Sequence, residues 1–244
     1  MIEVRNVSKT FNGRVRAVDK LSFDVPDGKI VGLIGPNGSG KTTMFKMIMG
    51  IYRPDKGKIF VGEHNIAIDA ILAKQNLGYV SDNPEMFLRL TGLEYLNFIA
   101  DMFQVSASKR QKSIAELTEI FEMGQILNDR ILSYSHGMKQ KIMVMGALVH
   151  QPQVWILDEP MIGLDPKSAF AMKEMMRQHA KAGKTVLFAT HVLEVAEKLC
   201  DEVVIICQGH LLYQGALDDL RDRYPKISSL ERIYLKLIEE GVPK

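Results

Sequence analysis

The sequence lacks the features that mark secreted and membrane-spanning proteins. Its 244 residues include only two cysteines, Cys200 and Cys207, which are too few for a secreted disulfide scaffold and do not have a metal-ligand spacing. Charges in residues 1–5 occupy the place where a signal peptide needs an apolar stretch. No apolar run approaches the roughly 18–20 residues that cross a bilayer. We therefore expect a soluble, cytoplasmic protein with both cysteines in its core.

An excess of charge of one sign is also missing, because the formal net charge is only +2. A protein that binds nucleic acid usually carries a basic patch, and the nearest candidate, residues 109–112, is typical of the solvated start of a helix. We therefore expect no nucleic-acid partner. The content of 46% hydrophobic and 25% charged residues is ordinary for a globular protein and suffices for one large core or two modest ones.

Strand and helix patterns alternate along much of the chain, which favours an α/β fold. Strand-like runs occupy residues 3–10, 21–25, 30–34, 58–61, 77–80, 154–157, 185–189 and 203–206. Apolar residues recur at helical spacing in residues 41–49, 93–103, 113–123, 138–149, 167–180, 192–199 and 228–240. Since only helical patterns occur between residues 85 and 150, we predict a helical subdomain inserted into the sheet.

A glycine-rich loop lies between the strand at 30–34 and the helix at 41–49. Residues 35–42, Gly-Pro-Asn-Gly-Ser-Gly-Lys-Thr, fit the pattern G-x-x-x-x-G-K-[ST] in the strand–loop–helix context that it requires. Glycines let backbone N–H groups turn toward phosphate oxygens, and the helix adds its positive N-terminal end. Lys41 would hold the terminal phosphates, and the Thr42 hydroxyl would ligate Mg²⁺. The predicted ATP-binding residues are Gly35, Pro36, Asn37, Gly38, Ser39, Gly40, Lys41, Thr42 and Thr43.

Two carboxylates follow the apolar strand at 154–157. A Mg²⁺ site beside a phosphate loop needs a carboxylate at the carboxyl edge of the sheet, and Asp158 suits this role. Glu159 would then orient or deprotonate the attacking water. An Asp-Glu pair is also common in charged turns, but the upstream phosphate loop favours the catalytic interpretation. The sequence therefore predicts hydrolysis of ATP.

Together with these two motifs, three further segments resemble the ATP-binding cassette (ABC) ATPases, and the resemblance covers nearly the whole chain. Residues 132–140, Leu-Ser-Tyr-Ser-His-Gly-Met-Lys-Gln, resemble the signature segment of that family. Residues 163–165 resemble its D-loop, and His191 after Thr190 resembles its switch histidine. Several motifs in the expected order are more specific than a phosphate loop alone.

The resemblance implies one nucleotide-binding domain of α/β class. It would have a P-loop NTPase core, an N-terminal antiparallel β subdomain and an inserted helical subdomain. The divisions would be an ATP-binding core at 1–84 and 151–224, a helical signature subdomain at 85–150 and a C-terminal helix at 225–244.

The resemblance also implies that two cassettes, taken here as two copies of this chain, face each other head to tail. Ser135 and Gly137 would contact the γ-phosphate of ATP bound to the partner, and Asp165 would order the interface. His191 would hold the γ-phosphate, the water and Glu159 in place. Each role has a structural alternative, since Ser135 and Asp165 also suit helix N-caps and a lone histidine is often structural.

Phe11 falls where the family places an aromatic residue that stacks on adenine, although a phenylalanine at a strand end is as often a core residue. The sequence departs from the family at Asp82, which replaces the usual Mg²⁺-ligating glutamine of the Q-loop. Asp82 would add a negative charge near Asp158, strengthening metal attraction but repelling phosphate. In the signature, His136 and Met138 replace glycine and glutamine while Gly137 is kept.

The function implied is that of the ATP-binding and ATP-hydrolysing subunit of an ABC transporter, with the transmembrane permease subunits on separate chains. The apolar loop at 83–91, with Pro84, Met86, Phe87 and Leu88, suits docking of a membrane partner, although it could equally be buried. The signature and tail resemble a bacterial exporter branch of type 2, located at the inner face of the plasma membrane. The alternative is a non-transport ABC ATPase that acts on DNA or ribosomes, which usually needs a coiled-coil insertion or a second cassette.

Overall fold

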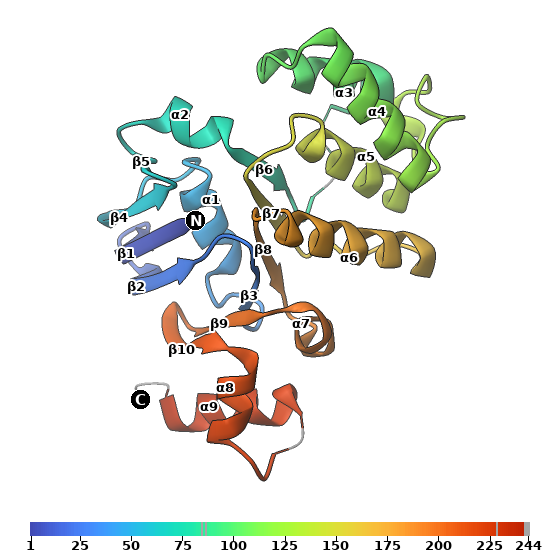
Figure 1. The fold of residues 1–244 in the computed structure, drawn as a ribbon. Helices are drawn as coiled ribbons and strands as arrows, with labels where there is room; N and C mark the ends of the chain where they lie inside the picture. The colour runs from blue at the N-terminus through green and yellow to red at the C-terminus, as the bar shows by residue number, and fades with distance from the viewer. Residues whose placement is uncertain (84, 86, 228, 242–244) are drawn as a thin grey trace.

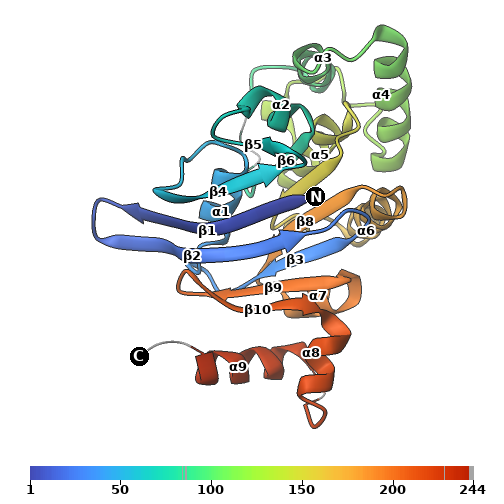
Figure 2. The ribbon, with the colours of Figure 1, turned by 60° about the vertical axis from the view of Figure 1, so that its left-hand side comes forward.

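Two β-sheets and the helices on their faces make up the computed structural model, which describes residues 1–83, 85, 87–227 and 229–241 (Figures 1 and 2). The strands are β1 (Ile2–Phe11), β2 (Val15–Val25), β3 (Ile30–Ile34), β4 (Lys56–Val61), β5 (His64–Asn65), β6 (Leu77–Val80), β7 (Val154–Asp158), β8 (Thr185–Thr190), β9 (Glu202–Cys207) and β10 (His210–Ala216). The α-helices are α1 (Lys41–Ile48), α2 (Ala70–Gln75), α3 (Gly92–Met102), α4 (Ala107–Phe121), α5 (His136–Leu148), α6 (Pro166–Lys181), α7 (Leu193–Leu199), α8 (Leu217–Arg223) and α9 (Leu230–Gly241).

The larger sheet has six strands in the order β10-β9-β3-β8-β7-β6. Strand β3 pairs in parallel with β8 and β9, and β7 pairs in parallel with β6 and β8, whereas β10 is antiparallel to β9. Side chains of β7 alternate between the two faces: Ile156 packs with α1, and Trp155 packs with α6. Because both faces are covered, the strands are continuously apolar, as the sequence pattern indicated.

The smaller sheet is antiparallel and has the order β2-β1-β4-β5, so the predicted N-terminal β subdomain is confirmed. Strand β2 begins at Val15, six residues before the predicted start at Leu21. Asn12 and Gly13 both have positive φ values, 52° and 65°, and join β1 to β2. An Asn-Gly pair between two strands is a strong hairpin signal, and it accounts for the longer strand.

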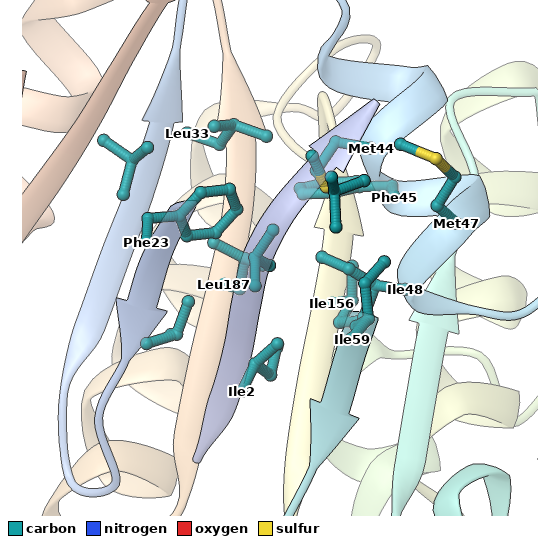
Figure 3. Close-up of a cluster of buried hydrophobic side chains, with 14 of the residues drawn as sticks. Ile2, Phe23, Leu33, Met44, Phe45, Met47, Ile48, Ile59, Ile156 and Leu187 are labelled. Atoms are coloured by element: carbon teal, nitrogen blue, oxygen red, sulfur yellow. The ribbon is translucent and has the colours of Figure 1, made fainter. Parts of the chain in front are cut away.

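Helix α1 lies between the two sheets and forms the centre of the first hydrophobic core (Figure 3). Its Met44, Phe45 and Ile48 are fully buried among side chains of both sheets, such as Phe23 and Leu187. The phosphate loop therefore leads into a helix that is held on two sides. Burial of each large apolar side chain contributes roughly 1.5–3 kcal/mol, which anchors the helix firmly.

Helices α3, α4 and α5 gather at one end of the molecule and pack with α6 on the other face of the large sheet (Figure 1). The described residues from 85 to 150 contain no strand, only one isolated bridge between Thr91 and Arg130 and a 3₁₀ turn at Ile131–Ser133. A capping box begins α3, in which the Thr91 hydroxyl accepts from Glu94 N and the Glu94 carboxylate accepts from Thr91 N. The predicted helical insertion is confirmed.

The prediction from the sequence did not include four short elements, which are β5, α2, β10 and α8. Each has seven residues or fewer, so its periodicity is too brief to separate from a loop. Cys207 is buried as predicted, whereas Cys200 is half-buried and packs against the edge of a core cluster. Among the described residues, no helix has both the length and the apolar character that crossing a membrane requires.

Candidate functional site

The carboxyl ends of β3, β7 and β8 meet at one edge of the large sheet. Ile34 at the end of β3 is level with Thr190 of β8, and Asp158 of β7 is level with Ala189 of the same strand. The residues that follow these strands therefore start side by side, although they are far apart in the sequence. Ligand sites in open parallel sheets form at this edge.

The loop between β3 and α1 requires glycine for both space and backbone conformation. Gly38 and Gly40 have φ values of 78° and 107°, which non-glycine residues rarely adopt. A methyl group at Gly35 would lie 2.5 Å from the Ser39 hydroxyl, and one at Gly40 would collide with the Ala17 carbonyl. The Ser39 amide donates to the Pro36 carbonyl at 3.1 Å, which closes the turn of the loop.

Lys41 at the start of α1 curls back over this loop. Its Nζ donates to the carbonyl oxygens of Gly35 at 2.8 Å and Pro36 at 3.1 Å, and only 6% of the residue is exposed. Burial lowers the pKa of Lys41, and the nearby carboxylates of Glu159 and Asp158 oppose this shift. A buried ammonium group held among carbonyls is well placed to move onto an anion.

Asp158 is 1% exposed, and neither of its carboxylate oxygens makes a hydrogen bond with the described residues. Burial raises its pKa to about 6; the Thr42 hydroxyl opposes this shift, and the charges of Asp82 and Glu159 add to it. An unpartnered buried carboxylate costs free energy unless a cation or a donor completes it. The pair of Thr42 and Asp158 beside a phosphate loop is the donor set that Mg²⁺ takes, together with phosphate oxygens and water.

Glu159 is held by His191 across the sheet edge. Its Oε1 accepts from the backbone N–H of His191 at 3.1 Å and lies 2.7 Å from the imidazole Nδ1. The backbone φ of Glu159 is 50°, in the left-handed region. Such strain costs on the order of 1–3 kcal/mol and is concentrated at functional sites. The two contacts therefore fix the position of the Glu159 carboxylate beside the His191 imidazole.

A cavity of about 390 Å³ brings most of the predicted residues together. It is lined by Phe11, Asn37, Gly38, Gly40, Lys41, Thr42, Thr43, Asp82, Asp158 and Glu159 of the predicted set, and by Val15 and Ala17. Gly35, Pro36 and Ser39 do not line the cavity but support the loop, and His191 is linked to it through Glu159. Phe11 lies at an edge-to-face angle to the Tyr52 ring, with the ring centroids 5.3 Å apart, and Lys9 Nζ lies 5.7 Å from the centroid of the Phe11 ring.

The sequence reading missed Val15 and Ala17 as residues of this cavity. Both belong to the early part of β2, which the strand prediction left out. The Asn12–Gly13 hairpin signal was the one sequence clue, because it returns the chain beside Phe11.

Ser135, Gly137 and Asp165 lie outside the cavity. Ser135 caps α5, since its hydroxyl accepts from the Met138 amide at 3.3 Å. Asp165 caps α6 and accepts from the Ser168 amide at 2.9 Å. Both structural alternatives from the sequence are confirmed, and the side chain of Ser135 remains exposed.

The apolar loop at 83–91 is only partly described, because Pro84 and Met86 lie outside the described residues. Leu88 is half-buried and packs on the helical core, whereas Phe87 is 37% exposed and its ring lies tilted against the ring of Phe98 of α3. Other large apolar side chains on the same end of the molecule are also exposed. They are Phe98 and Met102 on α3, and Ile68, Ile71 and Leu72 in or beside α2.

The sequence model of the family described as ABC transporter matches residues 18–162. The linearmycin resistance ATP-binding protein LnrL of Bacillus subtilis (strain 168) is 35% identical over 91% of this chain and 71% of its own. The ABC transporter ATP-binding protein NatA of the same organism is 31% identical over 99% of this chain and 100% of its own. The chain spans only 66% of the length of another relative, from Nostoc.

Solved structures share the fold. The structure of an ATP-binding subunit of an ABC transporter superposes with a TM-score of 0.93 at 31% identity, covering 97% of this chain and 99% of that one. The ATP-binding cassette MJ0796, described as dimeric, superposes with a TM-score of 0.80 at 24% identity, covering 89% of this chain and 99% of its own. At 24% identity, the match with MJ0796 shows only that the fold is shared.

Proposed function

The chain belongs to the ABC transporter family as an ATP-binding, ATP-hydrolysing subunit, and on this premise we propose that it works as a dimer. The dimer would hydrolyse ATP·Mg²⁺ and so drive an exporter whose membrane-spanning subunits are separate chains. The observation that carries the proposal is the convergence of three groups at one sheet edge. These groups are the phosphate loop, the unpartnered carboxylate of Asp158 and the Glu159–His191 pair.

The phosphate loop would bind the phosphates of ATP. Backbone N–H groups of residues 35–43 and the N-terminal end of α1 offer positive potential to the anion. Lys41 Nζ would exchange its two loop carbonyls for oxygens of the terminal phosphates. Phe11 would stack on adenine, in a wall shared with Val15 and Ala17.

Thr42 and Asp158 would hold Mg²⁺. The fit rests on the buried, unpartnered oxygens of Asp158 and on the neighbouring Thr42 hydroxyl. Bound between these residues and the phosphates, the ion would neutralise charge that develops on the phosphoryl group. Asp82 lines the same cavity, so its carboxylate adds a second negative charge toward the metal.

Glu159 would orient the attacking water and accept its proton. His191 holds Oε1 of Glu159 through two contacts, which positions the carboxylate, and its ring would also reach the γ-phosphate. As the water oxygen bonds to the γ-phosphorus and its proton passes to Glu159, the bond between the γ-phosphorus and the β–γ bridging oxygen would break, which yields ADP and phosphate. The backbone of Glu159 is in the left-handed region just after β7, and the two contacts with His191 hold its carboxylate at this edge.

A second copy of the chain would complete the site. Ser135 and Gly137 lie outside the cavity of their own chain, and the Ser135 side chain is exposed at the start of α5. A helix start with free N–H groups suits an anion, here the γ-phosphate held by the partner. Asp165 would order the same interface from the start of α6.

Membrane-spanning subunits would dock on the end of the molecule that carries α2 and α3. Both helices lie at the same end in Figures 1 and 2. Ile68 and Ile71 are 78% and 75% exposed, and Met102 is 63% exposed, which is unusual for large apolar side chains that face water. The location proposed is the inner face of a bacterial plasma membrane.

The direction of transport proposed is export, because LnrL is described as a linearmycin resistance protein. The helical signature subdomain proposed is 85–150, between core portions 1–84 and 151–224, with the C-terminal helix at 225–244. The relatives named above are transporter components, so nothing favours the alternative of a DNA or ribosome ATPase.

The test is the variant Glu159→Gln, with Glu63→Gln, an exposed glutamate in a turn, as the matched control. Loss of the general base should lower phosphate release by roughly 10²–10⁴-fold. ATP should still bind, and an ATP-dependent dimer should accumulate in light scattering. A Glu159→Gln protein that hydrolyses ATP at the wild-type rate would refute the mechanism, and one that stays monomeric with ATP would refute the dimer.

A further inference from the structure

The first turn of α5 interlocks with a loop of the same chain that carries Gly163. Gly163 has a φ of 78°, and a methyl group there would collide with the His136 ring and lie 2.9 Å from its Nε2. A methyl group at Gly137 would lie 2.7 Å from the Gly163 carbonyl oxygen. Gly163 therefore sits against both the side chain of His136 and the backbone of Gly137.

A second contact joins the same two segments one turn further along α5. Lys141 Nζ lies 3.4 Å from Oδ2 of Asp165, and the Lys141 side chain is largely buried. Asp165 accepts from both the amide and the hydroxyl of Ser168, at 2.9 and 2.5 Å. These hydrogen bonds, helped by Lys141, hold the pKa of Asp165 well below its usual range. The start of α5 is thus tied to the start of α6.

The loop that makes these contacts begins at Glu159; we refer to residues 159–165 as the connecting segment. Its turns are closed by hydrogen bonds from Ile162 N to Glu159 O at 3.2 Å and from Leu164 N to Met161 O at 3.4 Å. Because the segment is short and internally bonded, a shift at one end displaces the other. Glu159 is bonded to His191 at the chain's own ATP site.

We propose that His136 is a positioning residue that couples the ATP site of the chain to the signature turn that the chain offers to its partner. The inference rests on the proposed dimer. A change at Glu159 during hydrolysis moves Gly163 against the imidazole, and α5 carries Ser135 and Gly137 with it. The glycine usual at this position of the signature has no side chain to make this contact.

His136 acts through its ring surface rather than through a hydrogen bond. No hydrogen bond from its imidazole is present among the described residues, and its side chain lies outside the ATP cavity. His136→Phe keeps a planar ring over Gly163, whereas His136→Ala removes it. Lys139→Ala is the matched control, because Lys139 lies on the same turn of α5 and makes no side-chain hydrogen bond or ion pair within the described part of the chain.

The first experiment measures amide hydrogen exchange in the unliganded wild-type chain and the three variants. His136→Ala should speed exchange in residues 161–165 by about tenfold, since the loop loses a packed neighbour. His136→Phe and Lys139→Ala should match the wild type. Unchanged exchange in His136→Ala, or a His136→Phe profile that matches His136→Ala, would overturn the role of the ring contact.

The second experiment measures ATP hydrolysis against ATP concentration in the dimer-forming protein. His136→Ala should bring the Hill coefficient down to about 1 while ATP affinity at the first site changes less than about twofold, because only the coupling between sites is lost. His136→Phe should restore the wild-type coefficient. A coefficient that stays at the wild-type value in His136→Ala overturns the proposal. Wild-type kinetics without cooperativity, in a chain whose Glu159→Gln variant does not dimerise, would instead refute the dimer and the coupling with it.

Discussion

At the phosphate loop, Lys41 and Asp158 are 6% and 1% exposed, whereas at the start of α5 the side chains of Ser135 and His136 face solvent. The loop is closed by its own hydrogen bonds and backed by β3 and α1. The signature turn, residues 135–138 at the start of α5, is stabilised by its helix cap and by contacts between the start of α5 and residues 163–165. The two regions therefore differ in completeness: the residues that would bind ATP are buried and bonded within one chain, whereas the residues proposed to contact the ATP of a partner are exposed.

This contrast has a structural cause. Parallel strands have their carboxyl ends at one edge of the sheet, so the sheet alone brings the phosphate loop, Asp158 and His191 together. The signature turn belongs to the helical region, which packs on the opposite face of the sheet from α1. In the proposed dimer, a second copy of the chain would bring this part of α5 to ATP, so we expect the two regions to respond differently to mutation.

The largest expected effect is at the phosphate loop, where the groups that would bind ATP are buried. Lys41→Met removes the buried ammonium group, and ATP affinity of the single chain should fall about a hundredfold, because truncating one partner of a desolvated charge pair costs 2–5 kcal/mol. Binding of a fluorescent ATP analogue measures this. Lys46→Met on the same helix is the control. Equal affinity in Lys41→Met and wild type would remove the lysine from the site.

Ser135→Ala should spare ATP binding to the single chain and lower hydrolysis by the dimer about tenfold. The variant loses a phosphate contact across the interface and a helix cap worth about 1 kcal/mol. Ser133→Ala, in the preceding turn, controls for local effects. Analogue binding and phosphate release should be compared on the same samples. A parallel loss of both would mean that Ser135 acts only through folding.

Met102→Glu should weaken association with the membrane-spanning subunits about fivefold, because a charge is placed in an apolar interface, while ATP binding is unchanged. Leu88 is a poorer site for this substitution, since it is half-buried against the helical core. Leu235→Glu on α9, 54% exposed, is the matched control. ATPase stimulation by reconstituted membrane subunits measures the effect. Full stimulation of Met102→Glu would exclude this part of α3 from the docking surface.

Asp82→Gln should raise the Mg²⁺ concentration for half-maximal hydrolysis about threefold, because a carboxylate near the metal is replaced by a neutral carbonyl. ATP binding without Mg²⁺ should tighten, since repulsion of phosphate falls. Hydrolysis measured against free Mg²⁺ at saturating ATP tests this, with Glu63→Gln as the control. An unchanged Mg²⁺ dependence would exclude Asp82 from the metal site.

The smallest effect concerns pH. Burial lowers the pKa of His150 and of His179 to about 4, whereas an unfolded histidine titrates near 6.5. Keeping the two rings neutral costs little free energy above pH 6.5, but the free energy of unfolding falls as the pH drops from 6.5 toward 4. His150 Nε2 lies 3.1 Å from the Leu77 carbonyl oxygen and its ring stacks on Phe103, so acid should loosen the helical region from the sheet.

Urea unfolding at pH 7.0 and 6.2 measures this effect, and the expected loss is on the order of 0.5 kcal/mol for His150. His150→Phe keeps the stacked ring and should reduce the pH dependence by that amount, and the remaining pH dependence includes contributions from His179 and Asp158. Asp158 works in the opposite sense, because its raised pKa of about 6 favours the protonated, unliganded protein as the pH falls. A pH dependence unchanged in His150→Phe would show that His150 does not contribute.

The sequence by itself determined the parts that depend on local pattern. Residues 35–42 specify a phosphate loop, the apolar runs specify strands covered on both faces, and Ser135 and Asp165 specify helix caps. It also gave the order of the family's motifs and a helical insertion between residues 85 and 150. These features depend on neighbours a few residues away, so a linear reading captures them.

Only the tertiary structure decided which distant residues touch. The strand order places Glu159 against His191, the hairpin brings Val15 to the cavity wall, and α5 sets His136 over Gly163. The first and third contacts join residues 27 or more positions apart, and the second depends on where a turn falls. The forces that select them act through the packing of whole sheets and helices. The sequence thus specifies the chemistry at each strand end, and the parallel sheet brings those ends together.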